Sequence, residues 1–268
     1  MEWWPAYLAI GALVGFLAGL LGIGGGAFLV PMLVWVFAAR EFPADHILRI
    51  ALGTSMASIF FTSLSSMRTH HRYGSVDWKI AGAMSPGILA GSFGAALAAG
   101  YIATRPLAMI FTALAFYAAM QLLFDLRPRT TRTLPSSAGI FAAGGLIGVA
   151  SSLLAAGGAF LAVPFLTWCN VPLRRAIGTA AANGVPIAIA GSAGYVIQGL
   201  RIDPASAALP AGSLGYVYLP ALALIVVTSM LTAPLGARTA YRVPLKRLRM
   251  LFGLMMCGLA LRMLASLW

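Results

Sequence analysis

Charged residues are scarce in this chain of 268 residues, at 9% of the total against about 25% in a typical soluble domain. Acidic residues are the scarcest, with 6 Asp and Glu against 18 Lys and Arg. The hydrophobic set makes up 60% of the sequence. A soluble enzyme is therefore excluded by composition, and the basic residues are too few and too scattered to cover a phosphate backbone. We expect no nucleic-acid partner and take the lipid bilayer as the surroundings of the chain.

Catalytic and metal-binding patterns are also absent from the sequence. The two cysteines, Cys169 and Cys257, lie far apart in or beside apolar runs, and neither a disulfide framework nor a metal spacing follows from them. There is no GxxxxGK[ST] sequence for ATP, and no Ser–His–Asp set falls at one membrane depth. We therefore expect no enzyme activity, no catalytic residue, no metal site and no resident cofactor.

What the chain does contain is a series of apolar segments separated by short polar connections. A helix needs about 20 apolar residues to span a hydrocarbon core of about 30 Å. Ten apolar segments are recognisable, at residues 4–21, 27–39, 50–67, 80–101, 106–124, 136–154, 158–169, 176–198, 214–237 and 246–267. The sequence therefore predicts an all-α integral membrane protein, built as a polytopic helical bundle.

Two of the apolar stretches must be interrupted. Residues 3–39 are nearly uncharged, and one straight helix of that length would reach about 55 Å, well beyond the hydrocarbon core. Glycines at positions 22 and 24–26 mark the break, because glycine permits the backbone angles that end a helix. Residues 136–169 repeat the pattern, with Gly157 and Gly158 at the break. Each of the two stretches is expected to form a broken helix.

The two broken stretches belong to an internal repeat. Five positions of the first stretch have the same residue type as the position 133 residues later: Gly11, Gly15, Leu20, Gly25 and Pro31. The recurring positions are Gly144, Gly148, Leu153, Gly158 and Pro164. Duplication explains this shared order better than chance matching of small apolar residues. The first membrane repeat is placed at 1–130, the second at 134–268, and the linker at 125–135.

The basic residues indicate how the two repeats are oriented. If each broken stretch crossed the membrane, the repeats would be parallel and the 18 Lys and Arg would divide almost evenly between the two sides. If each stretch turns back at its glycines, thirteen fall on one side and five on the other, the usual asymmetry of an inner-membrane protein. We therefore predict two inverted repeats, each beginning with a Gly-interrupted helical hairpin. The basic connections 68–79, 125–135, 170–175 and 238–249 would face the cytoplasm, and both termini the opposite side.

The residues from Gly15 to Pro31, GFLAGLLGIGGGAFLVP, resemble the N-terminal signature of the TauE/SafE family of membrane permeases. The element Gly53-Thr54-Ser55 after the next connection is similar as well. Length, duplication and hydropathy extend the resemblance over the whole chain. The resemblance implies a transporter of small sulfur-containing or organic anions, such as sulfite, sulfoacetate, taurine or thiosulfate, without selecting one of them.

The two breaks are the first candidates for substrate binding. A broken helix leaves backbone N–H groups unpaired, and its positive dipole end favours an anion. Secondary transporters with inverted repeats commonly bind substrates at such discontinuous helices near the membrane midplane. The candidate residues are Gly24, Gly25, Gly26, Gly157 and Gly158. The alternative is that these glycines only permit tight helix packing.

Polar side chains at the start of the next helix in each repeat are the second candidates. Thr54, Ser55, Thr179 and Asn183 could donate hydroxyl or amide hydrogens to a bound anion. The alternative is that they bond to helix backbones, as small hydroxyl residues often do.

These features together indicate a secondary permease for a small anion, of the sulfonate or sulfite class, that works by alternating access. An anion channel with a glycine-lined filter, and an accessory membrane subunit without a path of its own, are the alternatives. The acidic residues all lie at or near connections, so no proton relay is evident within the spans. Coupling to a proton, to sodium or to neither stays open at this level, as do substrate identity, direction and oligomeric state.

Overall fold

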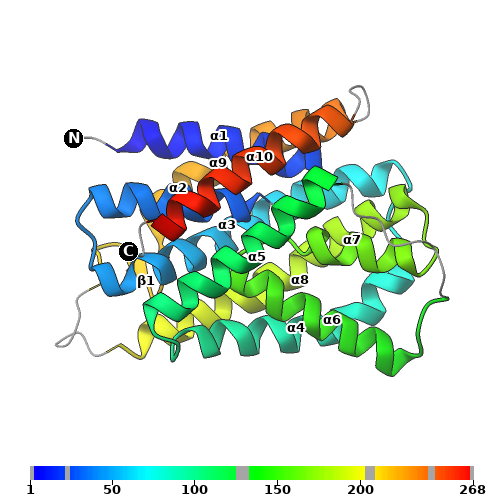
Figure 1. Ribbon diagram of the computed structural model, residues 1–268, viewed down its shortest axis with the longest axis horizontal. Coiled ribbons are helices and arrows are strands. Elements are labelled where there is room, and N and C mark those ends of the chain that lie inside the picture. Colours follow the sequence, from blue (N-terminus) through cyan, green and yellow to red (C-terminus); the bar gives the residue numbers. More distant parts are fainter. Residues whose placement is uncertain (1–2, 22–24, 125–132, 203–208, 241–244, 266–268) are drawn as a thin grey trace.

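The computed structural model describes residues 3–21, 25–124, 133–202, 209–240 and 245–265. Along these residues the chain forms ten helices and one small hairpin (Figure 1). The elements are α1 (Trp4–Leu21), α2 (Gly26–Ala39), α3 (Ala44–Arg72), α4 (Trp78–Ala99), α5 (Thr104–Phe124), α6 (Ser137–Leu154), α7 (Ala159–Trp168), α8 (Leu173–Leu200), β1 (Ser213–Leu214), β2 (Val217–Tyr218), α9 (Leu219–Ala240) and α10 (Leu245–Ala265). The two strands pair antiparallel directly before α9.

Six of the described helices are long and apolar enough to cross a membrane. They are α3, α4, α5, α6, α8 and the Leu219–Gly236 part of α9. Large apolar side chains are exposed on the outside of the bundle, among them Leu146 at 72% and Leu231 at 69%. Such a surface is suited to lipid, and the helices pair their backbone groups internally as hydrocarbon requires. The prediction of an all-α polytopic membrane protein is confirmed.

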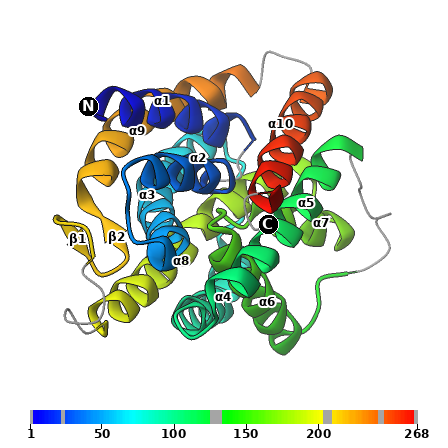
Figure 2. The same ribbon diagram turned by 60° about the vertical axis from the view of Figure 1, so that its left-hand side comes forward.

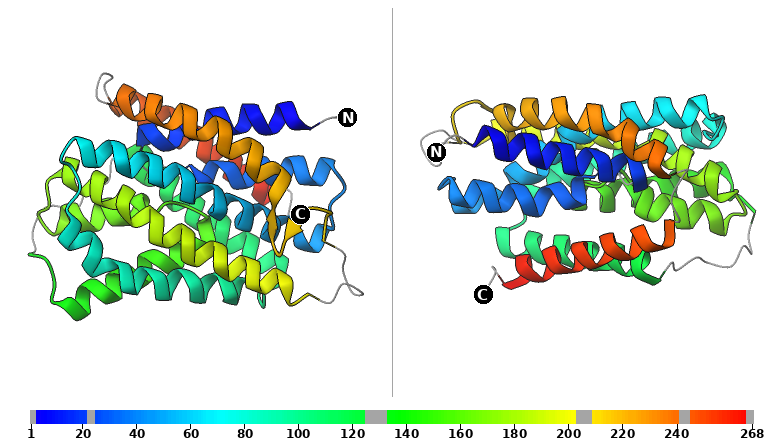
Figure 3. Two further views of the ribbon diagram at one scale, coloured as in Figure 1. Left: turned by 180° about the vertical axis from the view of Figure 1, so that it is seen from behind. Right: turned by 90° about the horizontal axis from the view of Figure 1, so that it is seen from above.

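Both interrupted stretches turn back on themselves. α1 ends at Leu21 and α2 begins at Gly26, and the two helices run in opposite directions (Figures 1 and 3). α6 and α7 form the same kind of hairpin, with α6 ending at Leu154 and α7 beginning at Ala159. The first hairpin opens toward the end of the bundle where α10 finishes, and the second opens toward the other end. Each stretch therefore enters and leaves the bundle by the same end.

The helices of the two halves of the chain pack against each other instead of forming separate units. α1 lies along α9, and α6 lies along α4 (Figure 2). The two longest helices, α3 and α8, contact each other, while α3 also contacts α9 and α8 also contacts α4. α5 packs against α10. The core is therefore shared between the halves.

A stripe of glycines allows α1 and α9 to approach closely. Gly11, Gly15 and Gly19 are spaced four residues apart and face α9. A Cβ atom on Gly15 would overlap the backbone of Ser229, and one on Gly19 would overlap that of Ala233. This spacing is a common device for helix contact in membranes, where lipid removes the hydrophobic driving force between helices.

We expect Gly15→Leu to destabilise the fold, because its side chain has no space between α1 and α9. Overpacking of this kind usually costs about 1–3 kcal/mol or more. Gly82→Leu is the matched control, since Gly82 also lies within a helix but has no atom within 4 Å of its Cβ position. Thermal unfolding in detergent measures both variants. Equal unfolding temperatures for the two would contradict the close packing of α1 on α9.

Candidate functional site

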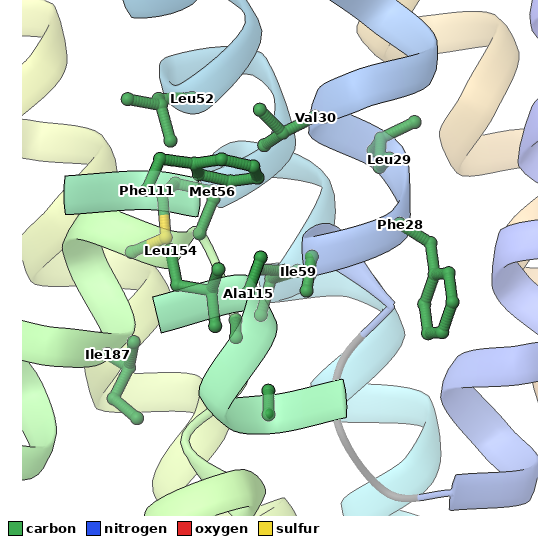
Figure 4. Close-up of a cluster of buried hydrophobic side chains, with 14 of the residues drawn as sticks. Phe28, Leu29, Val30, Leu52, Met56, Ile59, Phe111, Ala115, Leu154 and Ile187 are labelled. Atoms are coloured by element: carbon green, nitrogen blue, oxygen red, sulfur yellow. The ribbon is translucent and has the colours of Figure 1, made fainter. Parts of the chain in front are cut away.

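The two helix breaks meet inside the bundle. A Cβ atom on Gly26, at the start of α2, would overlap the carbonyl oxygen of Ala155, just after α6. Ile59 of α3 also lies here, with its Cδ1 2.6 Å from that Cβ position. Figure 4 shows Ile59, Met56 and Leu154 in the buried apolar cluster of this region. Each half of the chain therefore contributes one broken end to the same place, around Gly26, Ala155 and Ile59, which we call the central region.

Both short helices begin after a glycine with a left-handed backbone. The φ angle is 72° at Gly25 and 78° at Gly158, a conformation that other residues adopt only with strain. The Gly158 carbonyl accepts hydrogen bonds from the N–H groups of Leu161 at 3.1 Å and Ala162 at 2.8 Å, and the Gly25 carbonyl accepts the corresponding pair. No side chain caps either helix. The first N–H groups of α2 and α7, with the positive ends of the two helix dipoles, are therefore directed into the central region.

The two helix starts have equivalent neighbours with different chemistry. Val14 and Ala18 of α1 contact the Cβ position of the glycine before α2. The residues 133 positions later, Ile147 and Ser151 of α6, contact the Cβ position of the glycine before α7. The start of α7 thus has a hydroxyl group where the start of α2 has a methyl group.

Three buried polar side chains beside the second break each have an oxygen atom without a hydrogen-bond partner in the described part of the chain. Ser151 and Ser152, in the last turn of α6, and Asn183 of α8 are each 0% exposed. Both serine Oγ atoms and the Asn183 Oδ1 atom have no partner in the described part of the chain. The Asn183 Nδ2 atom donates only to a weak acceptor, the Met84 sulfur, at 3.5 Å. Leaving such groups unpaired costs free energy, so they mark a place where a polar ligand would be favoured.

Thr54 and Thr179, both predicted as site residues, bind the backbone of the opposite half of the chain. The Thr54 hydroxyl accepts a hydrogen bond from the N–H of Tyr218 at 2.9 Å, and the Thr179 hydroxyl accepts one from the N–H of Asp77 at 3.0 Å. In each case the glycine before the threonine lies against a carbonyl of the same connection. We call these two contacts the threonine clasps. One clasp joins α3 to the start of α9, and the other joins α8 to the start of α4.

The remaining predicted residues occupy several places. Ser55 is fully buried, and its Oγ atom has no partner in the described part of the chain. The Gly157 carbonyl oxygen lies 3.5 Å from the Cβ position of Gly184 in α8, the residue after Asn183. Gly24 lies outside the described residues. The structure thus brings both breaks and this part of α8 together, and the substrate-binding roles of all these residues stay predictions.

Two residues of this region, Gly184 and Met84, are not among those predicted from the sequence. Gly184 leaves space for the Ser63 hydroxyl and the Gly157 carbonyl, and its position next to Asn183 inside an apolar helix is a signal that could have revealed it. Met84 of α4 contacts the Asn183 amide, and nothing in the sequence indicates that pairing.

Arg49 is a buried cation that has no acidic partner in the described residues. It is 7% exposed, and its guanidinium group donates to the carbonyls of Ala99 at 3.2 Å, Asp45 at 2.6 Å and Ile102 at 2.5 Å. Ala99 is the last residue of α4, so the positive charge stabilises the negative end of that helix dipole. Arg49 therefore has a structural role.

A bundle of membrane-spanning helices with two broken helices meeting inside it defines a multi-pass membrane protein of the transporter class. Comparison with known families agrees with this assignment. The chain belongs to the family described as sulfite exporter TauE/SafE, whose model matches residues 7–263. It is thus a member of a membrane transporter family and not of an enzyme family.

Curated relatives carry a matching description. A probable membrane transporter protein of Haemophilus influenzae is 35% identical over 258 residues, which cover 96% of each chain. A similar protein of Methanocaldococcus jannaschii is 25% identical over 268 residues, which cover 97% of this chain and 95% of the relative. The probable membrane transporter protein YdhB of Bacillus subtilis is 28% identical over 195 residues, covering 70% of this chain and 76% of the relative. No solved structure matches the chain.

We expect Thr179→Val to lower the free energy of unfolding by about 1–3 kcal/mol, because the N–H of Asp77 then loses its acceptor. Thr62→Val is the matched control, since the hydroxyl of this buried threonine bonds only to carbonyls of its own helix. Thermal unfolding in detergent measures both variants. An equal decrease of the unfolding temperature in the two variants would show that the clasp adds no stability.

Proposed function

We propose that the protein is a secondary transporter for a small anion of the sulfite or sulfonate class. The meeting of the two helix breaks within an apolar bundle carries this proposal, because each break contains one uncapped helix start. Backbone N–H groups and two positive dipole ends can stabilise a negative charge there without a basic side chain. Glycine at both starts lets the oxygens of the anion reach the amides. The family description, sulfite exporter, supports a sulfur anion.

We infer that the two halves of the chain are inverted repeats. α1 and α6 run in opposite directions, as do α3 and α8 (Figures 1 and 3). The packing of α1 on α9 has its counterpart in the packing of α6 on α4. The threonine clasps follow the same rule, because each connects a helix of one half to the start of a helix from the other half.

The orientation we propose places both termini on the non-cytoplasmic side of the inner membrane. α1 begins and α10 ends at the same end of the bundle (Figure 1). Among the described residues, the connections at that end and the helix turns beside them carry five arginines, against nine Lys and Arg at the opposite end. The end richer in basic residues faces the cytoplasm in most inner-membrane proteins.

Alternating access requires two bodies that move relative to each other. We assign α9 with α1, α2 and α3 to an α9 body, and α4 with α6, α7 and α8 to an α4 body, so that the α3–α8 contact forms the boundary between the two. Each clasp lies inside one body, whereas the two breaks face each other across the boundary. Rocking of the bodies along the α3–α8 contact would open the central region first to one side and then to the other. We propose no resident cofactor, and this movement is compatible with coupling to a proton, to sodium or to neither.

We expect Gly158→Ala to weaken saturable anion counterflow in proteoliposomes, because the added methyl group strains a left-handed residue and displaces Ile187 Cδ1, which lies 2.5 Å from the Cβ position. Gly74→Ala is the matched control, since Gly74 has φ of 63° but no atom within 4 Å of its Cβ position. Sulfite and ethanesulfonate are the probes. Counterflow that survives Gly158→Ala at wild-type affinity would contradict the central site. Large single-channel currents in place of counterflow would identify a channel.

Cross-linking the two bodies should stop transport. Met56 of α3 and Gly191 of α8 contact each other across the boundary, with the Met56 sulfur 3.5 Å from the Gly191 Cβ position. The double variant Met56→Cys/Gly191→Cys is made in a protein without the two native cysteines. We expect a short, cleavable thiol cross-linker to stop its transport, and cleavage of the cross-link to restore it. Tyr101→Cys/Arg201→Cys, whose native side chains contact each other within the α4 body, is the control. Full counterflow in the cross-linked first pair would exclude rocking at this boundary.

A further inference from the structure

The start of α7 has polar chemistry that the start of α2 lacks. The Ser151 Oγ atom lies 3.4 Å from the Cβ position of Gly158, whereas the equivalent neighbour of Gly25 is the methyl group of Ala18. The two helix starts are therefore unequal as binding places, although their backbones have the same conformation. An anion that needs hydrogen-bond donors would be held more strongly at α7.

The Ser151 hydroxyl is available to a ligand at this helix start. Its side chain is 0% exposed, and its Oγ atom has no partner in the described part of the chain. A serine inside a helix often donates to a carbonyl one turn earlier, as Ser85 does to Ala81 at 2.8 Å. Ser151 makes no such bond, so its hydroxyl hydrogen can be donated to an anion.

The Asn183 amide, one helical turn from a residue that contacts this helix start, has a hydrogen-bond acceptor without a partner in the described residues. Asn183 lies one turn before Ile187 on the same face of α8, and Ile187 contacts the Cβ position of Gly158. The Met84 sulfur is an acceptor, so its contact with Asn183 requires the amide nitrogen on that side. The Asn183 Oδ1 atom is therefore the free side of the amide, and it can only accept a hydrogen.

We propose that the anion binds at the start of α7, where Ser151 donates to it and Asn183 Oδ1 accepts a hydrogen from it. This inference rests on the proposed function. An anion without an O–H or N–H group would leave the Asn183 oxygen desolvated and unpaired, which weakens binding. The site thus favours an anion that also carries a hydrogen-bond donor. Asn183 determines this specificity, and Met84 is a positioning residue for its amide.

The test compares ethanesulfonate with isethionate, its hydroxylated analogue. Competition against radiolabelled isethionate counterflow in proteoliposomes gives the apparent affinity of each. We expect the wild type to bind isethionate about 5- to 10-fold more tightly than ethanesulfonate, the value of one hydrogen bond. Asn183→Leu should remove this preference, and Met84→Leu should reduce it because the amide loses its orienting contact.

Ser151→Ala should weaken the binding of both anions about 10- to 100-fold and keep the preference for isethionate, because the lost hydrogen bond goes to the charged group. Ser66→Ala is the matched control. Ser66 is also buried with an unpartnered Oγ atom, but it lies two turns beyond Ile59 along α3. Both affinities should stay at wild-type values in this control.

Equal wild-type affinities for the two anions, or a preference that survives both Asn183→Leu and Met84→Leu, would overturn the inference. Thermal stabilisation of detergent-solubilised protein by isethionate separates this site from the transport proposal. If isethionate stabilises the wild type but not Ser151→Ala, and the wild type shows no flux, the site is supported and transport is overturned. If the wild type transports and Ser151→Ala binds both anions with unchanged affinity, the site is overturned and transport is supported. The absence of both flux and stabilisation overturns both.

Discussion

Hydrocarbon offers no hydrogen-bond partner, so backbone N–H and C=O groups inside the membrane must be paired within the protein or face something polar. Continuous helices meet this requirement along their length, but an uncapped helix start does not. The starts of α2 and α7 are uncapped, and the fold places both in the interior of the bundle, away from lipid. Each stretch turns back at its break, so the uncapped helix start lies inside the bundle. There it is surrounded by other helices and not by lipid.

The shared packing of the two halves is what surrounds the breaks. α1 and α6 are the outer arms of the hairpins, and each is held by a helix of the opposite half through close contacts at glycine. The threonine clasps then fix the starts of α9 and α4 to the long helices α3 and α8. The two breaks are thus held from both halves at once, while the boundary between the two bodies passes between them.

The positions of the breaks could be predicted from the sequence, because a nearly uncharged run longer than the membrane must be interrupted and Gly25 and Gly158 are the residues that permit it. The contact of Gly26 with Ala155 could not, because it depends on how helices far apart in sequence cross. The partners of Thr54 and Thr179 were missed for the same reason: each hydroxyl bonds to the opposite half of the chain. The orientation of the Asn183 amide depends on Met84, 99 positions away, and no local pattern reports it.

The pairing of α1 with α9 also has a consequence for the biogenesis of the protein. Ribosomes deliver the chain from its amino end, so α1 enters the bilayer long before α9 has been synthesised. Its glycine stripe therefore has no native partner until α9 has been synthesised. Insertion and folding are separated in time for this protein, and the last helices to be made complete the packing of the first.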